Sequence, residues 1–150
     1  AQNPCPCGNL LSLKKECRCN ELEINRYKNR LSEPFLDRID IFVTMNEVSS
    51  EDIADVNSKM LHKKVLQAFI MQKERGQNNL NGKLSDEELS KYCCMNDEAQ
   101  KTLQQAVQSL SLSFRATNKV LKVARTLADL SLCEPIQKEH ILEALSYRKR

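Results

Sequence analysis

The sequence predicts a mainly α-helical protein in two unequal parts, and three observations support this fold class. Everything after Ser49 follows the helical repeat of apolar residues, whereas only residues 39–45 alternate with the period of two that is typical of a strand. The chain of 150 residues also has only three glycines, which is few for a sheet-rich protein. Residues 1–46 are therefore expected to be the end of an α/β core, and residues 49–150 a compact helical bundle.

One helix and one strand are expected in the first part. After a proline- and cysteine-rich stretch, Asn20 has a glutamate three positions later, which is a capping box, and a helix is expected over about 21–31. Pro34 is expected to end this helix. The strand over 39–45 cannot bury both of its faces alone. Its neighbours are therefore expected before residue 1, in a chain that is entered in mid-domain.

Five helices are expected in the second part, each with a capping signal or an apolar stripe. Four begin at the capping residues Ser50, Ser85, Asn96 and Ser113, and the last spans about 137–147. The first continues to about Arg75 and is followed by a polar loop over 76–82. Its inward stripe is expected to be Leu61, Val65, Ala68 and Phe69.

The helix that begins at Ser113 is expected to have an inward and an outward face. The residues expected to face the core are Val120, Leu121, Ala124, Leu127 and Ala128. The residues expected to face outward are Lys119, Lys122, Thr126 and Asp129.

Composition excludes several functions for the chain by itself. The net charge is only +3, so any nucleic-acid contact has to come from a local patch. No run of about 18 apolar residues is present, so no membrane span is expected, and the first residues are not those of a signal peptide. No G-x-x-x-x-G-K-[ST] motif and no acidic Walker B strand occur, so nucleotide binding and hydrolysis by this chain alone are not expected. A cytoplasmic protein is expected.

Four early cysteines form the pattern C-x-C…C-x-C, as Cys5, Cys7, Cys17 and Cys19. Two close pairs joined by a short loop can place four thiolates around one Zn²⁺ in a closed, structural site. In a reducing compartment, clustered cysteines more often bind metal than form disulfides. The alternative is four reduced thiols in a flexible loop, and C-x-C is less typical of zinc sites than C-x-x-C.

The remaining cysteines and the histidines lack a partner at a ligand or catalytic spacing. Cys93, Cys94 and Cys133 are expected to be ordinary buried or half-buried residues. His62 and His140 are lone histidines on helices, so no functional role is expected for them.

Two arginines stand at the starts of elements. Arg38 lies just before the predicted strand, where an arginine is usually a surface or salt-bridge residue. Arg115 lies in the first turn of a helix, where acidic residues are preferred, so it contacts either an anion or a carboxylate elsewhere. The basic run over 25–30 is most simply a solvated helix face.

Several blocks in this order resemble the magnesium-chelatase-like AAA+ proteins of the bacterial ComM/YifB type, and the resemblance covers nearly the whole chain. The blocks are Asn3-Pro4-Cys5-Pro6-Cys7-Gly8, Cys17-Arg18-Cys19, Arg26-Tyr27…Arg30-Leu31-Ser32, Pro34-Phe35-Leu36-Asp37-Arg38-Ile39-Asp40 and Ala124-Arg125-Thr126-Leu127-Ala128-Asp129-Leu130. The resemblance implies the last helix and strand of an AAA+ α/β core, followed by the helical lid.

The resemblance also implies roles for three residues. Asn3 falls at sensor 1, which reads the γ-phosphate of ATP. Arg38 falls at the arginine finger that a neighbouring subunit receives in trans, and Arg115 falls at sensor 2 at the start of a lid helix. The implied substrate is ATP with Mg²⁺, in the complete protein rather than in this chain alone, and the implied assembly is a hexameric ring.

Three functions are compatible with these features. The first is the C-terminal part of a DNA-associated motor, which aids branch migration during natural transformation. The second is a magnesium chelatase ATPase subunit; the cysteine quartet favours the ComM-type branch over it. The third, from another class, is a zinc-stabilised helical interaction module that binds its partner without nucleotide.

Overall fold

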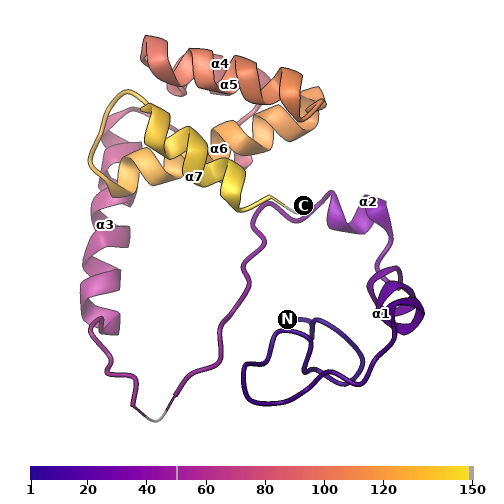
Figure 1. The fold of residues 1–150 in the computed structure, drawn as a ribbon. Helices are drawn as coiled ribbons and strands as arrows, with labels where there is room; N and C mark the ends of the chain where they lie inside the picture. The colour runs from indigo at the N-terminus through magenta and orange to yellow at the C-terminus, as the bar shows by residue number, and fades with distance from the viewer. Residues whose placement is uncertain (50, 149–150) are drawn as a thin grey trace. The chain divides into compact units, whose positions relative to one another are not determined.

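The computed structural model describes residues 1–49 and 51–148, and the chain divides into two compact units, Ala1–Ile53 and Ala54–Arg150. Its described residues form seven α-helices and one short 3-10 helix, which confirms the mainly helical fold class (Figure 1). None of these helices combines the length and the apolar character that crossing a membrane demands.

The first unit has two short helices where one was expected. The helix α1 spans Glu21–Lys28, and the predicted capping box is confirmed, because Asn20 Oδ1 accepts from the Glu23 amide at 2.9 Å while a Glu23 oxygen accepts from the Asn20 amide at 3.0 Å. Pro34 does not end this helix. It lies in the first turn of a second helix, α2, Glu33–Leu36, where a missing N–H costs nothing.

The strand predicted over residues 39–45 does not form. Residues 39–49 have no regular secondary structure, and the alternating apolar side chains Ile41, Val43 and Met45 are 50%, 61% and 79% exposed. A strand needs a neighbour for its backbone hydrogen bonds, and the described residues contain no other strand. The period-2 pattern therefore identified side chains that suit a strand, but the described residues contain no partner with which a strand could pair.

The second unit contains the remaining helices. They are α3, Ser58–Glu74; η1, Asn81–Lys83; α4, Asp86–Tyr92; α5, Asp97–Ser109; α6, Phe114–Leu130; and α7, Lys138–Ser146. The predicted caps Ser85, Asn96 and Ser113 are confirmed, since each side-chain oxygen accepts from the amide three residues later. The helix α3 begins later than expected and is capped by Asn57, whose side chain accepts from the Met60 amide at 2.9 Å. Ser50 lies outside the described residues.

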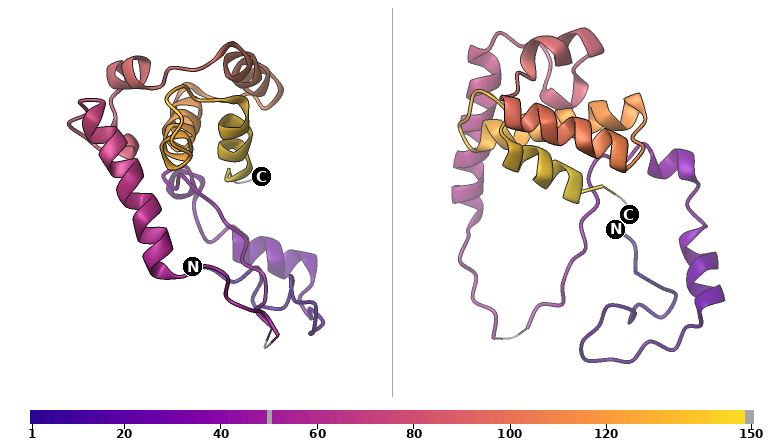
Figure 2. Two further views of the ribbon diagram at one scale, coloured as in Figure 1. Left: turned by 90° about the vertical axis from the view of Figure 1, so that its left-hand side faces the viewer. Right: turned by 45° about the horizontal axis from the view of Figure 1, so that its top comes forward.

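The core of the second unit forms around α6, which contacts α3, η1, α4 and α7, while α7 also packs against α5 (Figure 2). Of the five residues expected to face inward on α6, three are buried and two half-buried. The loop after α6 is tied to the start of α5 by a parallel bridge between Met95 and Ile136. The fully buried residues around α6 include Val120, Ala124, Ala128, Ile136 and Ile141.

The apolar stripe of α3 is largely exposed, contrary to expectation. Ala68 is buried, but Leu61, Val65 and Phe69 are 53%, 60% and 41% exposed. Figures 1 and 2 show the reason, because α3 lies beside α6 only over its C-terminal turns and its first turns extend past the other helices of the unit.

The prediction that Asp129 faces outward is wrong, since its side chain is fully buried between two arginines. Arg125, one turn earlier on α6, contacts Asp129 Oδ1 through Nε at 3.1 Å and Nη2 at 2.9 Å. Arg75, which caps α3, forms an ion pair with the same oxygen through its own Nη2. Asp129 therefore joins the end of α3 to the middle of the core.

Amide side chains complete this buried network. Asn81 of η1 donates to Asp129 Oδ2 at 2.8 Å and to Thr126 Oγ1 at 3.2 Å. Gln77 in turn donates to Asn81 Oδ1 at 3.0 Å, and the Asn81 amide donates to Gln72 at 3.2 Å. Both oxygens of the buried carboxylate are thus satisfied, as a charge in a low-dielectric interior requires.

Arg125 also fixes the turn after α6. Its Nη2 donates to the Cys133 carbonyl at 2.7 Å, and its Nη1 donates to the Glu134 carbonyl. Burial, only partly offset by Asp129, lowers the pKa of Arg125 from its usual value, and the nearby Arg75 adds to this effect. The guanidinium remains charged at neutral pH because an ordinary arginine titrates so far above it.

Replacing Asp129 with asparagine is expected to destabilise the protein strongly. The substitution keeps the shape of the side chain but leaves the buried guanidinium of Arg125 and the half-buried one of Arg75 without their counter-charge. Removing one partner of a buried ion pair costs about 3–5 kcal/mol. Urea unfolding of the chain, followed by circular dichroism, measures this loss. Glu87→Gln, on the exposed side of α4, is the control and should change the unfolding free energy by less than about 0.5 kcal/mol. A loss below about 1 kcal/mol for Asp129→Asn would contradict the assigned role of the network.

Candidate functional site

The four early cysteines converge on one point in the first unit. The Sγ atom of Cys5 lies 3.4 Å from that of Cys7, and the Sγ atom of Cys17 lies 3.7 Å from both. With Cys19 included, all four sulfurs lie within 4.8 Å of one another. A zinc–sulfur distance of about 2.3 Å gives a tetrahedron whose edges are about 3.8 Å, so the sulfurs stand close to the spacing of a zinc site.

The separations exclude disulfide bonds, whose sulfurs lie about 2.05 Å apart. All seven cysteines are free thiols. Cys5 is fully buried, Cys17 and Cys19 are half-buried, and Cys7 is exposed. The site is therefore closed on the side of Cys5.

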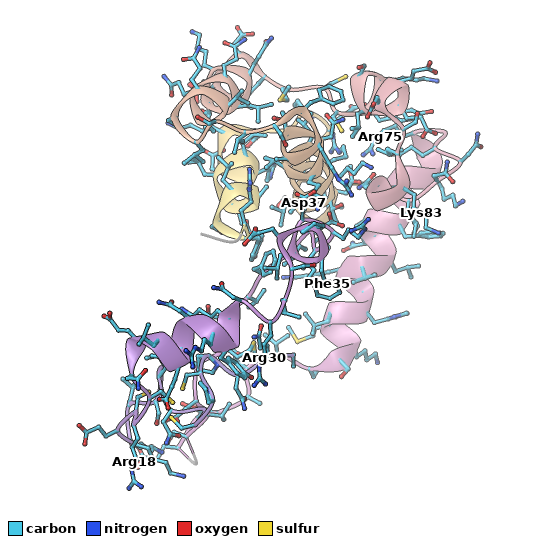
Figure 3. The ribbon with its side chains drawn as sticks, turned by 90° about the vertical axis from the view of Figure 1, so that its right-hand side faces the viewer. Arg18, Arg30, Phe35, Asp37, Arg75 and Lys83 are labelled. Carbon is cyan, nitrogen blue, oxygen red and sulfur yellow. The ribbon has the colours of Figure 1, made fainter. Side chains whose placement is uncertain are left out.

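The local sequence forms the two turns that hold the sulfurs. The Gly8 amide donates to the Cys5 carbonyl at 3.1 Å, and Gly8 has a φ of +80°, a region that only glycine enters without strain. In the connecting loop, Ser12 Oγ accepts from the amides of Lys14 and Lys15 at 3.2 and 3.1 Å. Arg18, between the second pair of cysteines, lies on the outside of the segment (Figure 3).

The thiols differ in their affinity for protons. Backbone hydrogen bonds with Asn9 and Arg18 lower the pKa of Cys7 to about 6. A backbone hydrogen bond with Cys7 lowers the pKa of Cys19, but desolvation and the neighbouring thiols outweigh it and raise that pKa to about 12. Metal binding to these thiols would release the protons that they carry, so the affinity for metal depends on pH.

Asn3 lies against the first turn of this cluster. A Cβ atom at position 8 would stand 3.8 Å from Asn3 Nδ2 and 3.9 Å from Asn3 Cγ, so the carboxamide lies alongside the Gly8 backbone. Its side chain is exposed. The structure thus places the predicted sensor residue next to the predicted metal ligands.

Arg38 follows α2 in the same unit. Its Nη1 atom donates to the Pro34 carbonyl at 2.8 Å, and the side chain is exposed. The Arg38 amide donates to the Phe35 carbonyl at 3.0 Å, so the turn that ends α2 fixes the backbone of this residue. A guanidinium has five N–H donors, so the bond to Pro34 leaves the group able to contact an anion as well.

Arg115 belongs to the second unit and is the second residue of α6. The cap at Ser113, whose Oγ accepts from the Ala116 amide at 3.2 Å, fixes the helix start that carries it. The side chain is exposed, whereas the next residue, Ala116, is buried. The helix start therefore presents an exposed cationic side chain in the first turn of α6.

The other three cysteines and both histidines lie outside the cysteine cluster. Cys93 is buried, Cys133 is half-buried, and Cys94, contrary to expectation, is exposed. His140 is buried and its Nδ1 accepts from the Gln137 amide at 3.1 Å, which caps α7, while His62 is exposed.

Sequence reasoning missed the roles of Arg125 and Asp129, which belong to one of the blocks that carry the family resemblance. They act in the buried network rather than at an exposed surface. One signal was available, since an arginine and an aspartate four residues apart within an otherwise apolar stretch are well placed to pair on a helix.

Comparison with known families gives two adjacent matches. Residues 1–53 match the family described as magnesium chelatase, subunit ChlI, and residues 55–148 match the one described as magnesium chelatase, subunit ChlI C-terminal. The division between the two matches coincides with the division between the two compact units.

Individual relatives align along 99% of the chain. A protein named YifB from Salmonella typhimurium is 37% identical, the competence protein ComM from Haemophilus influenzae is 35% identical, and YifB from Escherichia coli is 35% identical. The chain spans 30% of the length of each of these relatives.

The adjacent thiols Cys93 and Cys94 are expected to react very differently. Burial raises the pKa of Cys93 to about 11, so at pH 8 it is protonated as well as inaccessible, whereas Cys94 is exposed. Iodoacetamide at pH 8 should modify Cys94 and leave Cys93 intact, as peptide mass spectrometry can measure. In denaturant both should react. Equal modification of the two in the folded chain would show that the packing of α4 on α6 is wrong.

Proposed function

The chain belongs to the magnesium-chelatase-like family of the ComM/YifB type, and we propose that it is the C-terminal part of an AAA+ ATPase motor. The observation that carries this proposal is that the two family matches divide the chain where the two compact units divide, and each unit contains one of the two arginines to which the family resemblance assigns a role. The phosphate-binding loop and the acidic Walker B strand are not in these residues, so this chain alone is not an enzyme in the proposal.

In this proposal three side chains serve the nucleotide. Asn3 orients the attacking water at the γ-phosphate, Arg115 contacts the nucleotide from the lid, and Arg38 stabilises the charge that develops on the transferred phosphoryl group. Arginine suits the last two positions, because its planar guanidinium is always charged and binds phosphate oxygens in a bidentate manner.

Arg38 acts in trans in this proposal, on ATP held by a neighbouring subunit. Its exposure and its position at the end of a short helix support this role, because a finger has to extend beyond its own subunit. The complete protein is then a homo-oligomer, which we propose to be a hexameric ring, and ATP with Mg²⁺ is its substrate.

The cysteine cluster is proposed to bind one structural Zn²⁺. Cys5, Cys7, Cys17 and Cys19 supply four thiolates, which completes a tetrahedral site with no open position for catalysis. The sulfur spacing of 3.4–3.7 Å supports the proposal, as does the retention of all seven cysteines as free thiols. Such a site belongs in a reducing compartment, and we propose a cytoplasmic location.

For the process that the motor serves, we propose DNA processing, namely branch migration during natural transformation. The name of the competence protein ComM among the relatives supports this choice. A second candidate, a magnesium chelatase subunit, is supported by the descriptions of the matching families. The two are distinguished by whether DNA or a tetrapyrrole chelation partner stimulates ATP hydrolysis by the complete protein.

Arg38→Ala in the complete protein is expected to abolish ATP hydrolysis while sparing ATP binding. A finger arginine contributes about 10³–10⁵ in rate, because it acts on charge that appears only in the transition state. Steady-state hydrolysis and equilibrium binding of a fluorescent ATP analogue measure the two effects. Arg26→Ala, at an exposed arginine of α1, is the control and should change neither.

Mixing the Arg38→Ala protein with a protein whose phosphate-binding loop is disabled tests the action in trans. Mixed rings contain interfaces with an intact finger and an intact loop, so part of the activity should return. The isolated chain should show no hydrolysis in the same assay. Complete absence of rescue, or turnover by the chain alone, would contradict the proposal.

The chain purified without chelator is expected to contain about one equivalent of zinc. Elemental analysis measures the content, and Cys17→Ser should reduce it strongly, since three thiolates and a hydroxyl bind zinc less tightly. Cys133→Ser, at a thiol outside the cluster, is the matched control and should retain the metal. Less than about half an equivalent in the unmodified chain would exclude the site.

A further inference from the structure

We propose that metal binding at the cysteine cluster positions the side chain of Asn3, so that the metal site controls the sensor residue rather than only stabilising the segment. This inference rests on the proposed function for the identity of Asn3 as a nucleotide-contacting residue. The cysteines are positioning residues in it, because they act on the nucleotide only through Asn3.

The contact between Asn3 and Gly8 carries the inference. The Asn3 carboxamide lies along the Gly8 backbone, at 3.8 Å from the place of a Cβ atom. Gly8 closes the turn that begins at Cys5, with its amide bonded to the Cys5 carbonyl at 3.1 Å. The turn contains two of the metal ligands, Cys5 and Cys7, and Asn3 contacts its last residue. A movement of the sulfurs therefore changes the backbone against which the Asn3 side chain lies.

No apolar core holds Asn3 and its neighbours in place. Cys5 is the only buried residue among residues 1–20, all of which the structure describes, and it is buried at the cluster itself. A segment without an apolar core does not offset the conformational entropy that ordering costs. Its order therefore depends largely on what joins the sulfurs, and four thiols without a metal are joined to one another by weak S–H hydrogen bonds.

The conformation of Gly8 makes the coupling specific. Its φ of +80° is allowed for glycine and strained for other residues. An alanine at this position meets no clash, since its Cβ would stand at ordinary contact distance from Asn3. Gly8→Ala therefore disturbs the turn and the contact of the Asn3 side chain with it, while all four cysteine ligands are retained.

The test is a titration of the metal-free, ¹⁵N-labelled 150-residue chain with Zn²⁺, followed by nuclear magnetic resonance. The side-chain amide signals of Asn3 should shift and sharpen until one equivalent is bound. The side-chain amide of Asn118, which donates to Asp86 at 2.7 Å in the second unit, should not move. Cys17→Ser should abolish the response of Asn3, and Cys133→Ser should preserve it.

Gly8→Ala separates positioning from metal binding. This variant should bind zinc to the same stoichiometry and yet give a different Asn3 signal in the zinc-bound form. An Asn3 signal that ignores zinc while zinc binds at one equivalent would overturn the inference. An Asn3 signal that is identical in the zinc-bound Gly8→Ala variant and the unmodified chain would also overturn it.

Kinetics of the complete protein distinguish this inference from the proposed function. Gly8→Ala should lower kcat for ATP hydrolysis by up to about 10²-fold, the effect of a small misplacement of a positioning group, with little change in KM. Suppose that the Asn3 signal of the unmodified chain responds to zinc but Asn3→Ala leaves kcat unchanged. The proposed sensor role then fails while the coupling stands. If Asn3→Ala lowers kcat but Gly8→Ala does not, the coupling fails while the sensor role stands.

Discussion

The buried carboxylate of Asp129 is the constraint on which the helical unit depends. It is fully buried, and it is compensated by Arg125 on its own helix, by Arg75 at the end of α3 and by Asn81 of η1. A buried charge is tolerated only where such partners surround it. The helices α6, α3 and η1 therefore have to pack together at Asp129. The network thereby fixes which part of α3 packs on α6. The first turns of that helix lie beyond it, with their apolar side chains exposed.

Local signals in the sequence predicted the starts of helices well, because a cap is decided by a few adjacent residues. Asn20, Ser85, Asn96 and Ser113 all accept the amide three residues later, as their spacing indicated. The inward and outward faces were less predictable. A hydrophobic stripe identifies one buried face, but α6 has a second one, toward α3, that is lined by Arg125 and Asp129. Charged residues look solvent-exposed in a sequence unless their partners, here 54 residues away, are known.

The cluster of four cysteines was predictable because its ligands are close in sequence and chemically distinctive. The contact of Asn3 with Gly8 was not, since it depends on a single left-handed residue whose conformation no pattern reveals. The strand over 39–45 failed for a related reason. Its alternation describes side chains suited to a sheet, but backbone pairing needs a neighbouring strand, which the described residues do not supply. In both cases the structure depends on a group that the local sequence pattern does not include.

The two units are thus stabilised by different kinds of polar interaction. The helical unit surrounds one buried anion with cations and amides, whereas the first unit has almost no buried side chains and gathers four sulfurs instead. This contrast also divides the arginines. Arg75 and Arg125 pair with Asp129 inside the fold, whereas Arg38 follows the short helix α2 and is exposed. The proposed action of Arg38 in trans requires a guanidinium that is held by its backbone and yet extends into solvent. The structure is compatible with this proposal, since the Arg38 amide donates to the Phe35 carbonyl and the exposed side chain donates to the Pro34 carbonyl.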